Sequence, residues 1–283
     1  MVRRMTTLFV TGGSGTIGGC VINHYLKSTK FSRIVVFSRD EYKQSQMRRS
    51  INDERMRYFI GDIRDGARLK RAMEGAEVVV HCAALKQLDT GVTNPVEFAK
   101  TNVDGSINVM EAALDNNVRR VVAISTDKAV EPVCLYGATK LVAEGIFSHA
   151  KAYTGHRRTT FAIVRMGNVA HSRGSVIPYF SRLAAAGESL PVTHPEMTRY
   201  WVGQEQAQEL IASAVDGLGD LYLPRAMAFR LRDLVEAYGC PYHIVGLRDQ
   251  ERMYEKLDAN QSSEKPERWV TVEELREAIA CCS

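Results

Sequence analysis

The glycine-rich stretch LFVTGGSGTIGG, residues 8–19, constrains the fold of this 283-residue chain more than any other feature. A short apolar run typical of a buried strand precedes the glycines, and a helical pattern follows them. Glycine lets the backbone turn sharply and approach a pyrophosphate, while the helix N-terminus faces the negative charge. An unliganded glycine turn is the alternative, which this strand-loop-helix context disfavours. The residues predicted to contact a dinucleotide are Gly12, Gly15, Thr16, Ile17 and Gly18.

Short apolar runs recur along the first two-thirds of the chain, with helical patterns between them. They are rich in Val, Ile and Phe, as strands buried on both faces are. The predicted strands are Leu8–Thr11, Ile34–Phe37, Tyr58–Ile60, Val78–His81, Val121–Ser125 and Phe161–Val164. This alternation predicts an α/β fold, a Rossmann-like doubly wound parallel sheet with a small C-terminal substrate-binding part. We expect residues 1–170 to bind the cofactor and residues 171–283 mainly the substrate, with some later segments returning to the sheet.

Three local patterns locate further elements. Asn94, Pro95 and Glu97 form a capping-box arrangement at the start of a helix. The apolar face expected for that helix consists of Ala99, Val103, Ile107, Met110 and Leu114. The stretch TVEE at 271–274 predicts the start of a last helix, and the polar stretch 258–268 predicts a loose linker.

Composition and charge limit the partners of the chain. The net charge is +4, and the basic residues are scattered without interleaved aromatic side chains, so we expect no nucleic acid partner. No apolar run reaches the length of about 18 residues that spans a membrane, and the N-terminus lacks a signal-peptide pattern. The six cysteines match no zinc pattern. We therefore expect a cytoplasmic protein with no membrane partner and no metal.

The end of the second predicted strand selects the cofactor. An acidic residue about 20 residues beyond the glycines would bind the ribose of NAD, and Asp40 offers one. Asp40 also suits the N-cap of the following helix. Ser38, Arg39 and Lys43 instead offer a hydroxyl and positive charge to a 2′-phosphate. We therefore expect NADP, with NAD as the alternative.

Two later strand ends complete the predicted cofactor site. Asp62 follows the third strand and is placed to accept a hydrogen bond from an adenine amino group, with Ile63 packing on the ring. Ala83 and Ala84 follow the fourth strand and are small enough for the cofactor to lie close to the backbone. We expect His81, in the same run, to be structural and not catalytic.

Tyr136 and Lys140, in LYGATK, lie four residues apart and so share one face of a predicted helix. The charge of the lysine favours the phenolate and should lower the pKa of Tyr136. A phenolate can take the proton of a sugar hydroxyl while hydride leaves the carbon. Lys140 can also hold the ribose hydroxyls of the cofactor.

The chain resembles the extended short-chain dehydrogenase/reductase family from Thr7 to about Lys256, and within it the inverting UDP-N-acetylglucosamine 4,6-dehydratases. The matching stretches are SRDEYKQSQM, FIGDIRD, AALKQ, NPVEFAKTNVDGSINV, ISTDKAVEPVCLYGATK, RMGNVAHSRGSVIPYF and MTRYW. The resemblance implies a homo-oligomeric lyase that removes water from a UDP-sugar for surface-glycan synthesis, without net consumption of NADP.

The stretch STDK supplies the groups that water removal needs. Oxidation at C4 acidifies the C5 proton, after which a base takes that proton and an acid protonates the leaving C6 hydroxyl. Asp127 suits the acid if burial keeps it protonated, and Lys128 suits the base if its pKa is lowered enough to leave it neutral. Thr126 is expected to hydrogen-bond the C4 hydroxyl, with Ser125 as second choice.

The substrate contacts follow from the resemblance. Lys86 would line the sugar pocket, and the remaining residues would hold the sugar, diphosphate, uracil or ribose. The full set is Lys86, Asn168, Arg173, Ser175, Val176, Arg199, Arg248 and Glu251. The chain departs from the family at Gln87–Asp89 and in RDQERMYE at 248–255, which concerns substrate identity more than reaction type.

Two other functions stay open on the sequence. One is a nucleotide-sugar 4-epimerase or reductase of the same family, for which Lys128 has no evident use. The other is a catalytically inactive NADP-binding regulatory protein, against which the full set of candidate catalytic residues argues.

Overall fold

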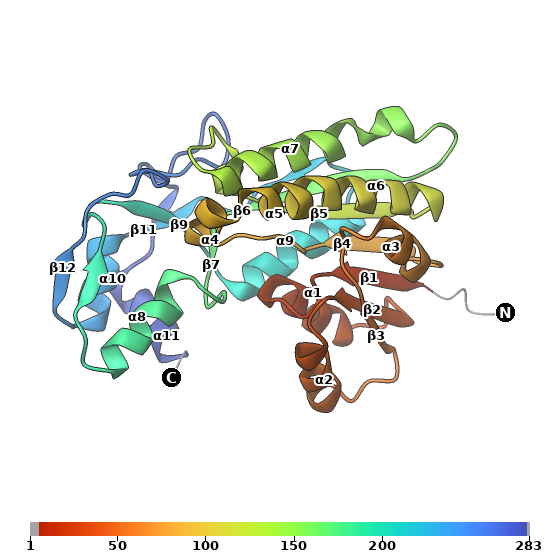
Figure 1. The fold of residues 1–283 in the computed structure, drawn as a ribbon. Helices are drawn as coiled ribbons and strands as arrows, with labels where there is room; N and C mark the ends of the chain where they lie inside the picture. Colours follow the sequence, from red (N-terminus) through yellow and green to blue (C-terminus); the bar gives the residue numbers. More distant parts are fainter. Residues whose placement is uncertain (1–5, 282–283) are drawn as a thin grey trace.

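The computed structural model describes residues 6–281 and contains a seven-stranded parallel sheet with strand order β10-β6-β5-β4-β1-β2-β3 (Figure 1). Its strands are β1 (Thr7–Thr11), β2 (Arg33–Ser38), β3 (Met56–Ile60), β4 (Val78–His81), β5 (Arg120–Thr126), β6 (Thr160–Met166) and β10 (Leu221–Tyr222). All neighbouring strands pair in parallel. Each predicted strand lies within an observed one, so the predicted Rossmann-like sheet is confirmed.

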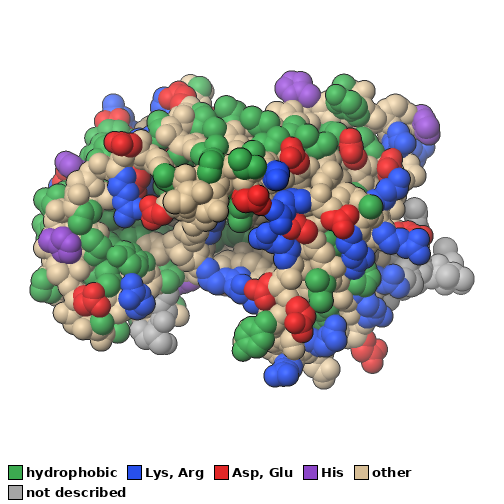
Figure 2. All heavy atoms as spheres, viewed as in Figure 1, with side chains coloured by type: hydrophobic (Ala, Val, Ile, Leu, Met, Phe, Trp, Pro, Cys, Tyr) green, Lys and Arg blue, Asp and Glu red, His purple; other side chains and the backbone are tan. Residues whose placement is uncertain are grey.

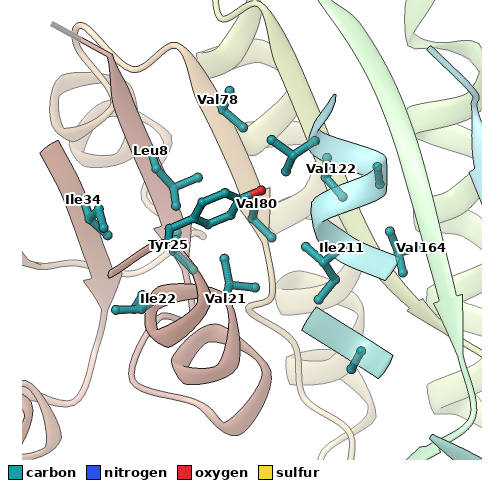
Figure 3. Close-up of a cluster of buried hydrophobic side chains, with 14 of the residues drawn as sticks. Leu8, Val21, Ile22, Tyr25, Ile34, Val78, Val80, Val122, Val164 and Ile211 are labelled. Carbon is teal, nitrogen blue, oxygen red and sulfur yellow. The ribbon is translucent and has the colours of Figure 1, made fainter. Parts of the chain in front are cut away.

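Successive side chains of a strand point to opposite faces of the sheet, and in this sheet both sets are apolar. Helices therefore cover both faces. Leu8 and Val10 of β1 pack against Val21 and Ile22 in one apolar cluster (Figure 3), whereas Phe9 packs in a second cluster on the other face. The first face is covered by α1 (Thr16–Leu26), α2 (Glu41–Ser50) and α9 (Gln204–Asp216), the second by α3 (Gly66–Ala72), α6 (Gly105–Asp115) and α7 (Leu135–His149). The carboxyl ends of the strands remain as the edge at which ligands can bind.

The helix predicted from residue 94 begins as expected, with Asn94 as N-cap and Pro95 as its first residue, but a π turn interrupts it. After α4 (Leu88–Thr93), α5 covers only Pro95–Ala99, and a π-helical turn, Lys100–Asp104, precedes α6. The predicted capping box is wrong: Asn94 donates to the carbonyl of Thr90 and the hydroxyl of Thr93, and Glu97 pairs with Arg64. The π turn inserts one residue and rotates the buried face, so Phe98 is buried while Ala99 is exposed.

The later residues build a second core beside the sheet. A four-stranded sheet has the order β13-β11-β9-β7, and β12 pairs with β8. The strands are β7 (Asn168–Val169), β8 (Leu190–Val192), β9 (Thr198–Val202), β11 (Met227–Arg230), β12 (Tyr242–Ile244) and β13 (Arg268–Trp269). The helices are α8 (Val176–Ala185), α10 (Leu231–Tyr238) and α11 (Val272–Ala280). Thr271 and Glu274 form the expected capping box of α11. Although α9 and β10 follow residue 170, they pack with the first sheet.

The sequence analysis also considered a membrane-spanning segment and a signal peptide. Within residues 6–281, no helix is both long and apolar enough to cross a bilayer. The N-terminal residues 1–5, considered for a signal peptide, lie outside the described part.

Candidate active site

The glycine loop forms a cradle at the carboxyl end of β1. Gly12 has a φ of +64°, and a Cβ there would lie 2.8 Å from the backbone nitrogen of Ala83. A Cβ on Gly18 would lie 2.5 Å from the carbonyl oxygen of Gly12, so only glycine allows this close approach of loop, helix and β4. A dinucleotide needs such bare backbone around its pyrophosphate, and the residues present therefore fit one.

A hollow of about 310 Å³ opens from this cradle and is called the cofactor hollow below. Its lining includes most of the predicted cofactor residues: Gly12, Gly15, Ser38, Arg39, Lys43, Asp62, Ile63, Ala83 and Ala84. Thr16 and Ile17 lie in the first turn of α1. The structure thus brings segments that are 70 residues apart in sequence around one hollow, as expected for a cofactor site.

The charged residues in the cofactor hollow are arranged around the end of β2. Asp40 caps α2 by accepting from the backbone nitrogen of Lys43 at 2.9 Å, and its carboxylate also pairs with the ammonium of Lys43. Arg39 lies 3.8 Å from Asp62 and its side chain is 53% exposed. Arg39 is therefore accessible to an incoming phosphate, whereas Asp40 is occupied as a helix cap.

Asp62 and Ile63, the two residues expected at the adenine, already make contacts within the protein. The carboxylate of Asp62 accepts from Arg64 at 2.8 Å and is half-buried. Ile63 is 4% exposed and packs in the core beneath Gly105, although it also contributes to the lining of the cofactor hollow. His81 is buried between the hydroxyls of Thr11 and Ser106, at 2.7 and 3.4 Å, in agreement with a structural histidine.

Asp127 and Lys128 lie where β5 ends and a short 3₁₀ turn, Asp127–Ala129, begins. The Nζ atom of Lys128 is 3.2 Å from Oδ1 of Asp127, which also accepts from the hydroxyl of Thr126 at 3.0 Å. Thr126 accepts in turn from the backbone nitrogen of Lys128. The expected acid and base are therefore in direct contact. Asp127 is 1% exposed and the side chain of Lys128 21%.

The pKa of Asp127 shifts in the expected direction, whereas the pKa of Lys128 shifts in the opposite direction. Burial raises the pKa of Asp127, and the nearby charge of Glu255 raises it further. Burial alone would lower the pKa of Lys128, but the charges of Asp127 and Glu255 outweigh it and raise that pKa. The expected low pKa of Lys128 is thus wrong for the site as it stands, because two carboxylates flank the amine.

Glu255 is the residue that the sequence did not reveal. Its Oε1 atom lies 3.1 Å from Nζ of Lys128, and its side chain is 3% exposed. Arg252 and Arg199 approach the same carboxylate at 3.4 and 3.8 Å. The backbone nitrogen of Glu255 donates to Ser263, a residue of the predicted linker that is fully buried. Glu255 ends the stretch RDQERMYE that the sequence analysis compared with the family, and this position was the available signal, since no periodicity around it indicates burial.

Tyr136 and Lys140 lie on the first turns of α7, beside the 3₁₀ turn. Burial raises the pKa of Tyr136 to about 12, while the charge of Lys128 and a hydrogen bond with Thr126 act in the opposite direction. The expected lowering by Lys140 is therefore not seen. Burial lowers the pKa of Lys140 to about 8, and its Nζ donates to the carbonyl of Ile124 at 2.7 Å. Tyr136 therefore lies next to Thr126, at the end of β5, and next to the Asp127–Lys128 pair.

The arginines expected on the substrate are divided between different places. Arg199 is 8% exposed, and its guanidinium donates to the carbonyls of Thr198 and Arg252. Its Nε atom lies 3.8 Å from Oε1 of Glu255, so this side chain is held inside the protein and is not open to a substrate diphosphate. Arg173 donates to the carbonyl of Ser14 on the glycine loop and lines the cofactor hollow. The sequence analysis assigned Arg173 to the substrate, and that assignment stays a prediction; its chain position after β7 brings it to the glycine loop.

A second hollow of about 330 Å³ is lined by Leu88, Asp89 and residues 247–251. Arg248 crosses it to Asp89 at 3.2 Å. Within residues 6–281, Oε2 of Glu251 is buried without a hydrogen-bond partner. The assignment of Arg248 and Glu251 to the substrate stays a prediction.

The other substrate candidates flank these sites. Partial burial and the charges of Lys128 and Arg173 lower the pKa of Lys86, which places the three cations near one another. Asn168 begins β7, which pairs with β9, and Ser175 and Val176 begin α8. Across residues 6–281, no cluster of three or more His, Cys, Asp or Glu side chains is arranged for a metal ion.

Comparison with known proteins places this chain in a family. A family model described as "Polysaccharide biosynthesis protein" matches residues 8–275. The chain belongs to that family. It is 38% identical over 261 residues to a UDP-N-acetylglucosamine 4,6-dehydratase (inverting) of Campylobacter jejuni, covering 90% of this chain and 78% of the relative. It is 35% identical over 270 residues to a UDP-glucose 4-epimerase of Rickettsia rickettsii, covering 92% and 79%.

Among solved structures, Pen from Bacillus thuringiensis superposes with a TM-score of 0.90 at 31% identity, covering 99% of this chain and 100% of Pen. The family resemblance expected from the sequence motifs is therefore confirmed, as is the fold. Its relatives carry two different activity names, so the residues of the site have to distinguish a dehydratase from an epimerase.

Proposed function

We propose that this protein is an NADP-dependent UDP-N-acetylglucosamine 4,6-dehydratase that inverts C5 and yields a 4-keto-6-deoxy UDP-sugar. One observation carries the proposal: an aspartate and a lysine, 3.2 Å apart, lie beside Tyr136 at the carboxyl end of β5. Removing water across C5 and C6 needs an acid and a base in addition to the tyrosine that oxidises C4, whereas epimerisation at C4 needs only that tyrosine. The inverting dehydratase among the relatives supports the same reading.

The residues of this chain divide the reaction among them. Tyr136 takes the proton of the C4 hydroxyl, helped by Lys140, which holds the cofactor ribose. A nicotinamide held in the cofactor hollow would supply the hydride acceptor for oxidation at C4 and the hydride donor for reduction at C6. Lys128 removes the C5 proton and Asp127 protonates the leaving C6 hydroxyl. Thr126 orients the carboxyl of Asp127 by donating to it.

The ion pair explains how Lys128 can act as a base despite its raised pKa. A proton that moves from Nζ of Lys128 to Oδ1 of Asp127, 3.2 Å away, leaves a neutral amine and a protonated carboxyl in one step. That pair is the one that elimination requires. Burial raises the pKa of Asp127, which lowers the free-energy cost of this proton transfer.

For the cofactor we propose NADP in preference to NAD. The exposed guanidinium of Arg39 and the hydroxyl of Ser38 line the cofactor hollow together with Lys43. These groups suit a 2′-phosphate, since arginine meets phosphate with paired hydrogen bonds. We assign Arg173 to the same ligand, because it lies against the glycine loop.

Two broader properties belong to the proposal. Leu141 and Val142 of α7 are 45% and 49% exposed, and Figure 2 shows hydrophobic side chains gathered along α7, which supports a homo-oligomer formed through this helix. Cys20, Cys82, Cys134, Cys240 and Cys281 are free thiols. Free thiols suit a reducing compartment, so we place the enzyme in the cytoplasm, acting on a precursor of surface glycans.

The mass of the product tests the proposed activity. The purified protein is incubated with NADP and UDP-N-acetylglucosamine, and the sugar nucleotide is analysed by mass spectrometry. We expect a product lighter by one water. An isomer of unchanged mass would indicate the 4-epimerase instead, and tight NADP binding without turnover would indicate an inactive regulatory protein.

A further inference from the structure

Two carboxylates flank the amine of Lys128, and their surroundings differ. Oδ1 of Asp127 and Oε1 of Glu255 lie 3.2 and 3.1 Å from Nζ. Glu255 also faces two arginines, whereas Asp127 accepts from the hydroxyl of Thr126. Within residues 6–281, one oxygen of each carboxyl, Oδ2 of Asp127 and Oε2 of Glu255, is buried without a hydrogen-bond partner. Two acids at the same base can therefore hold different protonation states.

We propose that Glu255 is a positioning residue for water elimination: it holds the amine of Lys128 and, by staying ionised between two arginines, leaves Asp127 as the carboxyl that carries the transferable proton. This inference rests on the proposed dehydratase function. Glu255 itself is not expected to touch the sugar, because its carboxylate is engaged by Lys128, Arg199 and Arg252.

The anchoring of Glu255 supports a positioning role. Its backbone nitrogen donates to Oγ of Ser263 at 2.8 Å, and Ser263 hydrogen-bonds the hydroxyl of Thr198 at 2.7 Å. Arg199 and Arg252, which hold the carboxylate, are themselves tied to backbone carbonyls, Arg252 to that of Val130 beside the 3₁₀ turn. The carboxylate is thus fixed by segments from three parts of the chain and holds Lys128 in one orientation.

The charges around the pair favour this division of roles. Burial would raise the pKa of Glu255, but Lys128, Arg199 and Arg252 together lower it, so Glu255 stays ionised. For Asp127 burial dominates and the charge of Glu255 adds to it, so its pKa is raised. Like charges at one site cannot both persist without cost, and the arginines decide which carboxyl takes the proton.

The first test measures the protonation of Lys128 without any cofactor or substrate. Lys128 is labelled with acetic anhydride across a range of pH, and its peptide is quantified by mass spectrometry in the wild type and in Glu255→Gln. Only the neutral amine reacts, so the midpoint reports the pKa of Lys128. We expect the midpoint to fall by about one pH unit or more when the carboxylate is lost.

Activity supplies the second readout. We expect Glu255→Gln to slow water elimination by about 10²-fold and to move its pH profile to lower pH. Glu255→Asp keeps the charge, so we expect a labelling midpoint near that of the wild type and a loss of less than about tenfold. In the glutamine variant, Lys128, Arg199 and Arg252 would face one another without the carboxylate. If that variant does not fold, Glu255→Asp still provides a test.

Glu131→Gln is the matched control. Glu131 pairs with Lys256, next to Glu255 in sequence, but its side chain is 62% exposed and points to solvent. We expect wild-type labelling and activity for it. If Glu255→Gln matches this control in both readouts, or if Glu255→Asp loses as much as Glu255→Gln with unchanged labelling, the inference is overturned. A wild type that removes no water would instead refute the dehydratase function, while labelling would still test the charge of Glu255.

Discussion

Gly137 sets how closely α7 approaches the turn that carries Asp127 and Lys128. A Cβ at this position would lie 2.0 Å from the carbonyl oxygen of Lys128 and 2.9 Å from its carbonyl carbon. Because non-bonded carbon and oxygen atoms rarely approach within about 3 Å, an alanine would push helix and turn apart by about 1 Å. Tyr136, the preceding residue, would then move away from the acid–base pair.

The expected cost of Gly137→Ala follows from that displacement. A misplacement of about 1 Å at reacting groups lowers turnover by about 10²-fold, and overpacking in a close contact costs about 1–3 kcal/mol of stability. Turnover is measured as the rate of water loss, and stability as the free energy of unfolding in urea. Both should fall together in this variant.

Gly145→Ala provides the control on the same helix. Its Cβ would meet nothing within 4 Å, so only helix propensity changes. We expect unchanged turnover and a gain of about 0.5–1 kcal/mol. If Gly137→Ala keeps wild-type turnover and stability, the close approach of α7 to Lys128 is not what positions the site.

Two further predictions concern the cofactor and acid stability. Arg39→Ala should weaken NADP binding by about tenfold and leave NAD binding unchanged, as measured by calorimetry; equal losses for both would contradict a 2′-phosphate contact. Burial and the charge of Lys140 lower the pKa of His81 to about 3. Below the usual histidine pKa of about 6.5, the unfolded chain therefore binds a proton at this imidazole, whereas the folded chain does not. Stability should therefore fall by about 2 kcal/mol from pH 7.5 to pH 5, and urea unfolding of His81→Asn should lack this loss; the same loss in that variant would contradict the assignment.

The sheet could be predicted from the sequence because its signal is local. Runs such as Val78–His81 are apolar throughout, as strands buried on both faces must be, and observed β4 has the same bounds. The glycine loop and the Tyr136–Lys140 spacing are likewise local patterns. The helix after residue 94 begins where predicted, but its capping box does not form, because Glu97 pairs with Arg64, a contact that sequence spacing does not reveal.

The electrostatics of the site were not predictable in the same way. The pKa of Lys128 depends on Glu255, which is 127 residues away in sequence and is buried by Arg199 and Ser263. The contacts of Glu255 with Lys128 and Arg199 join segments from different parts of the fold, whereas Ser263 lies eight residues further along the same segment. Arg173 shows the same limit, since the turn after β7 brings it to the glycine loop.

The deuterium content of the product tests the central claim most directly. The reaction with UDP-N-acetylglucosamine is run in deuterium oxide and the product is examined by mass spectrometry and proton NMR. Inversion requires that the proton taken by Lys128 be replaced from the opposite face, so we predict loss of water and one deuterium at C5 in the inverted configuration. A product that retains its original C5 hydrogen, or an isomer that keeps its water, would contradict elimination by the Asp127–Lys128 pair.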